Sequence, residues 1–366
     1  MYKRIIVKVG TSVLTSGTDK LDRSHMVELV RQSADLHRQG LDLIICSSGA
    51  IAAGREKLRY HGHESSISEK QMLAAVGQSS LIRAWESLFD LFDIPVGQVL
   101  LTRADIGHRL SFLNARDTLL TLLEHRIVPI VNENDAVATA EIRVGDNDNL
   151  SALVGLVAEA DLLLLLTDQQ GLFTSDPAKN PEAELIPEVQ AIDDTLKRLA
   201  GTSTSGLGVG GMVTKLEAAD TARRAGADVI IASGHTANVI LRAARREPVG
   251  TVFRARESPL EQRKKRILAG SRPDGRIIVD EGAARALITD GSSLLPAGIS
   301  NITGAFDRGD PVAIADAGGK EIAIGISRYG SVEAHRIAGA HSDGIQDILG
   351  YAFGPVVVHR NDMIVL

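Results

Sequence analysis

Two short stretches of the sequence combine lysine with glycine, a composition suited to holding phosphate. Residues 206–215, GLGVGGMVTK, contain four glycines and end on Lys215. Successive glycines let backbone N–H groups converge on an anion, and the positive end of a following helix adds to the attraction. In VKVGTS, Lys8 stands two residues before Gly10, at the end of an expected strand. The alternatives are a hairpin without a ligand at 206–215 and an exposed, solvated ammonium at Lys8.

Asparagine and acidic residues are unusually dense in NENDAV (132–137) and VGDNDNLSA (144–152). The calcium loop of an EF-hand does not explain them, because its central glycine and closing glutamate are absent. A helix N-cap would use only one of them. We therefore interpret the cluster as donors and acceptors for a polar, zwitterionic substrate, with one carboxylate holding the lysines in place. Its members are Asn132, Glu133, Asn134, Asp135, Asp146, Asn147, Asp148 and Asn149.

Two further strand ends carry polar residues. CSSGA places Ser47 and Ser48 before a helix, where hydroxyl and N–H groups suit a carboxylate or phosphate, although a simple N-cap is the alternative. LLLLLTDQQG places Thr167 and Asp168 after the most apolar run. An adenine or ribose could lie over that loop, or the aspartate could be an ordinary turn former.

This set of residues fits phosphoryl transfer better than acyl or acid–base chemistry, because no histidine or cysteine nucleophile is evident. Phosphoryl transfer depends mainly on positioning and on neutralising the charge of the phosphoryl oxygens. A carboxylate acceptor needs no general base, since a glutamate side chain with a pKa of about 4.3 is already ionised at neutral pH. The repulsion between two anions would be offset by Lys8, Lys215 and phosphate-bound Mg²⁺.

These residues must be positioned by the first two-thirds of the chain, where apolar runs alternate with amphipathic segments. Such alternation predicts an α/β fold with a doubly wound, mainly parallel sheet covered on both faces. Ligands of this architecture bind beyond the carboxyl ends of the strands, which is where the polar residues lie. The expected strands are 4–9, 41–46, 95–101, 127–131, 162–167 and 227–233, and the expected helices are 23–39, 50–59, 69–92, 109–124, 148–159 and one beginning near 212.

The pattern changes after residue 255, so we predict a domain at 1–255, a linker at 256–274 and a small β-rich domain at 275–366. The linker has five basic residues between Arg256 and Arg266, which we interpret as a solvated connector rather than a nucleic-acid contact. Repeated turn signals separate strands such as RIIVD, DPVAIAD and EIAIGIS, and two amphipathic segments, 281–289 and 331–339, would pack on them.

Composition excludes several classes of protein. The only cysteine is Cys46, so no intrachain disulfide is possible, and a cytoplasmic location is the default. The N-terminus shows no signal peptide, and acidic residues interrupt the longest apolar stretch, so we expect no membrane span. A net charge of −6 argues against nucleic-acid binding by bulk electrostatics.

The motifs VKVGTSVLT, SSGAIAAGR, VNENDAVATAEIRVGDNDNLSAL, LLTDQQGLFTSDP and SGLGVGGMVTK, in this order, resemble the glutamate 5-kinase branch of the amino acid kinase family. The segment containing VDEGAARAL, SLLPAGI, GDPVAI and AIGISRY resembles a PUA domain. The resemblance spans nearly the whole chain. It implies phosphorylation of the γ-carboxylate of L-glutamate with MgATP, giving glutamyl 5-phosphate at the entry to proline synthesis.

The resemblance also implies roles for individual residues, while it leaves the metal ligands unknown. Lys8 and Lys215 would contact the transferred phosphoryl group, and Asp148 would orient them. Glutamate would be bound by Ser48, Asp135 and Asn147. The nucleotide would be held by Lys8, Thr167, Asp168, Val209, Gly210, Gly211, Met212, Val213, Thr214 and Lys215.

Proline as a feedback inhibitor and a homo-oligomer are further expectations from the resemblance. We expect proline to act through the loop 139–150, because this loop overlaps the expected substrate contacts. Another small-acid kinase of the same fold, for aspartate or acetylglutamate, is an alternative. RNA binding by the PUA-like domain is another. That domain has seven Lys or Arg and eleven Asp or Glu, and this acidic balance is a poor match to a phosphate backbone.

Overall fold

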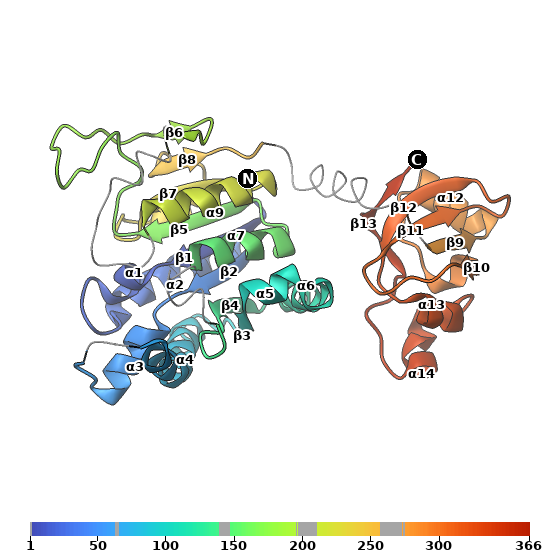
Figure 1. Ribbon diagram of the computed structural model, residues 1–366, viewed down its shortest axis with the longest axis horizontal. Coiled ribbons are helices and arrows are strands. Elements are labelled where there is room, and N and C mark those ends of the chain that lie inside the picture. The colour runs from blue at the N-terminus through green and yellow to red at the C-terminus, as the bar shows by residue number, and fades with distance from the viewer. Residues whose placement is uncertain are drawn as a thin grey trace. The chain divides into compact units, whose positions relative to one another are not determined.

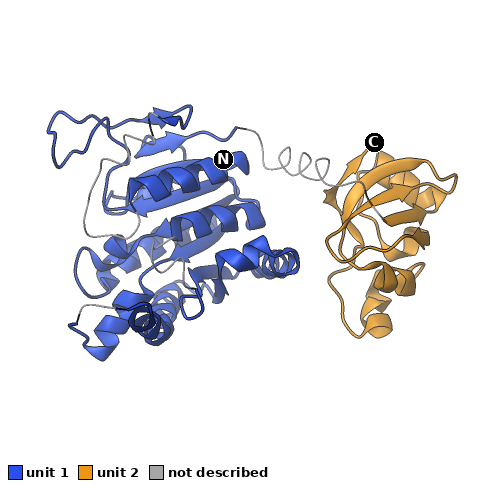
Figure 2. Ribbon diagram, in the orientation of Figure 1, with its two compact units in different colours: residues 1–259 blue, residues 260–366 orange. Residues whose placement is uncertain are grey.

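The computed structural model describes residues 2–62, 66–138, 147–194, 196, 211–256, 273 and 275–366. The chain forms two compact units, residues 1–259 and 260–366 (Figure 2). Most of the expected linker at 256–274 lies outside the described residues, so its boundaries stay a prediction.

The first unit is built on a sheet with strand order β3-β4-β2-β1-β5-β7-β8-β6 within the described residues (Figure 1). Neighbouring strands are parallel, except that β7 and β8 are antiparallel. This confirms the predicted doubly wound, mainly parallel sheet. The strands are β1 (Arg4–Val9), β2 (Asp42–Ser47), β3 (Val96–Leu101), β4 (Val128–Glu133), β5 (Leu162–Thr167), β6 (Glu188–Val189), β7 (Asp228–Ser233) and β8 (Thr251–Phe253).

The middle parts of the central strands are apolar because helices cover both of their faces. In β5, Leu162, Leu164 and Leu166 join one buried cluster, while Leu163 and Leu165 join the other. Successive side chains of a strand point to opposite faces, so a strand buried on both sides has no polar alternation. Burial of all six β5 residues is therefore what its leucine run predicts.

Helices α2, α4 and α10 contribute to the buried cluster on one face, and α6, α7 and α9 to that on the other. Short helices α1, α5 and α10 were not predicted from the sequence. No helix in the described ranges is long and apolar enough to cross a membrane. The helices are α1 (Thr11–Thr15), α2 (Arg23–Arg38), α3 (Ala50–Leu58), α4 (Ile67–Asp90), α5 (Arg103–Gly107), α6 (Arg109–Glu124), α7 (Asn147–Ala158), α9 (Met212–Arg224) and α10 (Val239–Ala244).

The second unit is a small β-rich domain with its own core around Ile277, Val312 and Tyr329. Its described strands lie in the order β10-β9-β11-β12-β13, with β9 and β11 parallel and the other pairs antiparallel. Its elements are β9 (Gly275–Val279), α12 (Glu281–Thr289), η2 (Pro296–Gly298), β10 (Ile299–Thr303), β11 (Pro311–Ala315), β12 (Glu321–Ser327), α13 (Ser331–Ile337), η3 (Ser342–Gly344), α14 (Ile345–Leu349) and β13 (Val358–Val365).

Candidate active site

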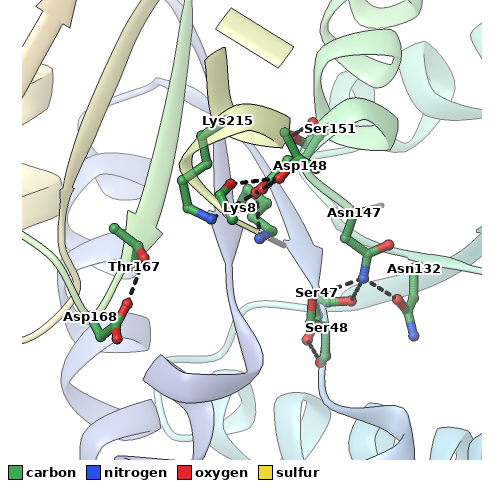
Figure 3. Close-up of polar contacts among 12 residues, drawn as sticks. Lys8, Ser47, Ser48, Asn132, Asn147, Asp148, Ser151, Thr167, Asp168 and Lys215 are labelled. Carbon is green, nitrogen blue, oxygen red and sulfur yellow. Dashed lines mark hydrogen bonds and ion pairs between the residues drawn. The ribbon is translucent and has the colours of Figure 1, made fainter. Parts of the chain in front are cut away.

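The carboxyl ends of four adjacent strands bring polar residues to one edge of the sheet. In the order β4, β2, β1 and β5, the strand ends carry Asn132, Ser47, Lys8 and Thr167. Because these strands are parallel, their carboxyl ends lie at the same edge of the sheet, which is the usual ligand position in such sheets. Figure 3 shows the lysines between two groups of polar side chains, with Thr167 on one side and Asn132 on the other.

At the centre, Lys8 and Lys215 contact the two oxygens of one carboxylate (Figure 3). The Nζ of Lys8 lies 2.6 Å from Oδ1 of Asp148, and the Nζ of Lys215 lies 3.1 Å from Oδ2. Lys8 and Lys215 are 5% and 6% exposed, and Asp148 is fully buried. The alternative that Lys8 is a solvated surface charge is therefore wrong. Two lysines separated by most of the domain sequence meet at a single site.

Lys8, Asp148 and Lys215 come from β1, α7 and α9, and the positive N-terminal ends of the two helices affect Asp148 and Lys215 in opposite ways. Asp148 is in the first turn of α7, where the positive end of the helix favours an anion. Lys215 is in the first turn of α9, where the same effect opposes a cation. Lys215 therefore depends on the Asp148 carboxylate for its stability as an ammonium. The Thr214 Oγ1, also on α9, lies 2.9 Å from Oδ2 of Asp148 and 2.8 Å from the carbonyl oxygen of Gly211, and its one hydrogen can be donated to either.

Burial and the two ammonium charges act in opposite directions on Asp148. Burial alone would raise the pKa of Asp148, but the charges of Lys8 and Lys215 outweigh it and lower the pKa to about 2. Desolvation lowers the pKa of Lys215, and the nearby Asp148 charge partly opposes that effect. With both lysines protonated, the cluster carries one excess positive charge, so it suits a site that receives anions.

On the side of β2 and β4, a network of amides and hydroxyls surrounds Asn147, the first residue of α7 (Figure 3). Its Nδ2 lies 2.9 Å from the Ser48 Oγ, 3.0 Å from the Asn132 Oδ1 and 3.3 Å from the Ser47 carbonyl oxygen. The Oδ1 of Asn147 is buried and has no hydrogen-bond partner among the described residues. An acceptor atom is thus left available for a ligand.

The Ser48 hydroxyl does not cap α3. The N-cap of that helix is Gly49, which has a φ of 97° and makes no side-chain cap hydrogen bond. The left-handed conformation favours glycine, because an L side chain is strained there. The turn consequently leaves the Ser48 hydroxyl beside Asn147 rather than over the helix end, so the simple N-cap alternative is wrong.

Asp135 follows β4 and is half-buried. In the described part of the chain, the hydrogen bonds around Asn147 do not extend to Asp135, although both were predicted to bind the same substrate. Desolvation raises the pKa of Asp135 to about 6. A carboxylate that is poorly solvated in this way gains from pairing with a cationic ligand group.

On the side of β5, the Thr167 hydroxyl donates to the Asp168 carboxylate at 2.9 Å. Thr167 is buried and Asp168 is exposed. The first turn of α9 follows Gly211, the N-cap residue, which makes no side-chain cap hydrogen bond. A methyl group on Gly211 would meet no described atom within 4 Å, so there is open space at this helix end. Val209 and Gly210 lie outside the described residues, and Met212 and Val213 begin α9.

Sequence reasoning missed three residues of α4 that contact the side of the site formed by β2 and β4. Gln78 accepts a hydrogen bond from the Asn132 amide at 2.7 Å. The Trp85 indole N–H donates to the Ser47 Oγ at 2.9 Å, and the Gln71 amide donates to the Ala138 carbonyl at 3.2 Å. The available signal was the spacing of seven residues, which places two glutamines on the same helical face as the only tryptophan.

Comparisons with known proteins agree with this architecture. The amino acid kinase family matches residues 3–233, and the PUA domain matches residues 275–349. A protein named glutamate 5-kinase from Shewanella halifaxensis is 59% identical, over 100% of this chain and 98% of its own length. Proteins of the same name from Photobacterium profundum and Salmonella paratyphi B are each 59% identical, over 99% and 98% of this chain and 96% and 98% of their own lengths. Among solved structures, UMP kinase from Bacillus anthracis is similar with a TM-score of 0.48 and 15% identity, over 70% of this chain and 97% of that chain. The chain therefore belongs to the amino acid kinase family, in the branch whose relatives are named glutamate 5-kinase, and it has a C-terminal PUA domain.

Proposed function

We propose that the protein transfers the γ-phosphoryl group of ATP to the γ-carboxylate of L-glutamate, which gives L-glutamyl 5-phosphate in the first step of proline biosynthesis. The observation that carries the proposal is the contact of Lys8 and Lys215 with one buried carboxylate. On one side of this contact lie the amides and hydroxyls around Asn147, and on the other lie Thr167 and Asp168. The names and high identity of the relatives support glutamate as the acceptor.

The charge balance of the centre suits transfer between two anions. Glutamate is ionised at neutral pH and attacks without a base, but its carboxylate and the ATP phosphates repel each other. Ammonium groups held in a water-poor site neutralise such charge without reorganising during the reaction. Lys8 and Lys215 would contact the moving phosphoryl group, and Asp148 would keep both ammonium groups in place.

The amide-rich half suits glutamate itself. The Ser48 oxygen lies within hydrogen-bond distance of the Asn147 amide, so its own hydrogen is available for a substrate carboxylate oxygen. The buried Oδ1 of Asn147 would accept from the α-ammonium group. Asp135, with its raised pKa, would pair with the same ammonium.

The other half would hold ATP through Thr167, Asp168 and the start of α9, with Val209 to Lys215 along the phosphates. The open space at Gly211 and the buried cations fit a phosphate chain. Mg²⁺ would supply further neutralisation of phosphate charge. In the described ranges no cluster of three or more metal-ligating side chains occurs. The ion would be held by substrate phosphates with one or two carboxylates. Asp148 is unsuited to that role because both its oxygens contact ammonium groups.

The proposal is tested by incubating the purified protein with ATP and a panel of acids, while hydroxylamine traps any acyl phosphate. We expect turnover of glutamate, and turnover of aspartate or acetylglutamate without glutamate would refute the assignment. Lys8→Met should lower kcat by about 100-fold or more, as for loss of one group that stabilises the transition state. The control Lys20→Met, at an exposed position, should stay within about twofold, as surface substitutions usually do.

Three further properties rest on the family resemblance. Proline would act as a feedback inhibitor near residues 139–150, of which 139–146 lie outside the described residues, and its addition should raise the KM for glutamate. The protein would form a homo-oligomer, which light scattering after size-exclusion chromatography would measure. The acidic PUA domain would be structural or regulatory, and a micromolar RNA affinity that falls with salt would overturn that role.

A further inference from the structure

One face of α4 supports the half of the site formed by β2 and β4. Gln71, Gln78 and Trp85 are spaced by seven residues, so they lie two turns apart on the same side of the helix. Their hydrogen bonds reach Ala138, Asn132 and Ser47 respectively. Of the three, only Gln78 bonds to a side chain that itself contacts Asn147.

The position of α4 is fixed by close backbone packing beside Gln78. A Cβ atom on Gly77 would lie 1.8 Å from the carbonyl oxygen of Ala50, the first residue of α3. A Cβ on Gly54 would lie 2.0 Å from the Leu73 carbonyl oxygen. The two helix backbones therefore touch directly, with no side chains between them. Gln78 is held at a constant place relative to the Ser48 turn that precedes α3.

The hydrogen bonds have a defined direction along the chain of amides. The two hydrogens of the Asn147 Nδ2 are shared among three neighbouring oxygens, of which the Ser47 carbonyl oxygen, at 3.3 Å, can only accept. A flipped amide would place the Asn147 Oδ1 against that carbonyl oxygen, so the Nδ2 lies on this side. Asn132 must then present its Oδ1 to Asn147, and its own Nδ2 needs another acceptor. Gln78 Oε1 is that acceptor, at 2.7 Å. Without it, the Asn132 amide would lose a partner, and rotation of that amide toward another acceptor would release Asn147.

We propose that Gln78 is a positioning residue that orients the Asn132–Asn147 amide pair and thereby makes the site select an acceptor that carries an α-ammonium group. The link is the Oδ1 of Asn147, which has no hydrogen-bond partner in the part of the chain that the structure describes and lies on the other side of the amide from Nδ2. An oxygen at this place accepts a hydrogen bond from an ammonium group, and it makes no such bond with an acid that lacks this group. The inference rests on the proposed function, because it identifies how glutamate is recognised.

The test compares two ligands on four forms of the full-length protein: wild type, Gln78→Met, Gln78→Glu and Gln39→Met. Glutarate has both carboxylates of glutamate and lacks the ammonium group, so its inhibition constant reports binding without that contact. Gln78→Met removes the acceptor at similar length, and Gln78→Glu keeps one. Gln39→Met makes the same change at an exposed position just after α2.

We expect Gln78→Met to raise the KM for glutamate about tenfold, as for an amide left without its partner. The KM for ATP and the glutarate inhibition constant should change by less than about twofold, as for groups remote from the change. Gln78→Glu should recover most of the loss, and Gln39→Met should behave as wild type. Thermal unfolding of each variant separates misfolding from a local effect.

The outcomes distinguish this inference from the proposed function. Suppose that wild type turns over glutamate. If Gln78→Met then weakens the binding of glutamate and of glutarate equally, or leaves both unchanged, the positioning role is refuted while the kinase assignment stands. Equal loss in Gln78→Glu and Gln78→Met would also refute it. If wild type does not phosphorylate glutamate at all, the proposed function fails first and this inference fails with it.

Discussion

Replacing Asp148 with asparagine tests the centre of the site most directly. The substitution keeps the shape of the side chain but leaves Lys8 and Lys215 without their common counter-charge. The pKa of Asp148 is lowered from 3.8 to about 2, and each pKa unit corresponds to about 1.4 kcal/mol, so its ionised form stabilises the fold by roughly 2 kcal/mol. A carboxyl pKa that is lower in the folded state contributes stability at neutral pH, and this is lost as the pH falls from about 4 toward 2.

Two effects of Asp148→Asn are expected at neutral pH. The free energy of unfolding should fall by about 2 to 5 kcal/mol, because breaking a buried ion pair leaves charge uncompensated. kcat should fall by about 100-fold or more, since displacement of a catalytic group by 1 Å can cost this much. The KM for ATP should change much less than kcat, because other contacts hold the nucleotide.

The alkaline pH profile gives an independent measurement. Desolvation lowers the pKa of Lys215, and the Asp148 charge opposes that effect. Without the carboxylate the pKa of Lys215 should fall further, so residual activity of Asp148→Asn should decline at lower pH than wild-type activity. Asp19→Asn, at an exposed position, is the matched control. An unchanged kcat, or an alkaline limb that does not move, would refute the role of Asp148 in holding the lysines.

Three more outcomes follow from the same site. Because the pKa of Asp135 is about 6, kcat/KM for glutamate should fall as the pH drops through that value; Asp135→Asn should remove this step, and an identical profile would exclude Asp135 from substrate binding. Gly10 has a φ of −73°, and a Cβ there would lie at ordinary contact distances, 3.4 Å from the Leu166 carbonyl oxygen and 3.7 Å from the Lys8 Nζ, so Gly10→Ala should keep its Tm; the methyl would fill space beside the Lys8 ammonium that a phosphate needs and should raise the KM for ATP, and kinetics like those of wild type would contradict this. Trp85 is the only tryptophan and bonds to Ser47, so saturating glutamate should change its fluorescence more than ATP does, and an equal response to both would count against the assigned halves.

The sequence predicted the long elements well because burial on both faces leaves a strong pattern. The expected strand at 162–167 coincides with β5, and the expected helix at 109–124 coincides with α6. The short helices α1 and α5 have five residues each, too few to establish a helical period. In β13, the polar run His359–Asp362 interrupts the apolar pattern, which explains why this strand was missed.

The residues of the candidate site also differ in how far they could be predicted from the sequence. Residues at strand ends, such as Lys8 and Thr167, were identifiable because the topology of parallel sheets puts strand ends at the ligand edge. For Gln78 the sequence offered only the seven-residue spacing with Gln71 and Trp85, which does not identify its role, since that role depends on how α4 packs against α3 through Gly54 and Gly77. A helix face carries no comparable positional rule, and its polar residues usually face water.

The order of strands in space explains how the Asp148 carboxylate could serve both halves of the proposed site. β1 lies between β2 and β5, so Lys8 stands between the amides near Asn132 and the hydroxyl of Thr167. Asp148 and Lys215 reach it from α7 and α9, whose buried residues share one cluster that includes Ala152 and Ala219. Small side chains allow two helices to approach closely, so core packing, rather than a loop, sets the distance between the carboxylate and the second lysine. The two ammonium groups would then remain fixed at the place where we propose that the donor and acceptor anions meet.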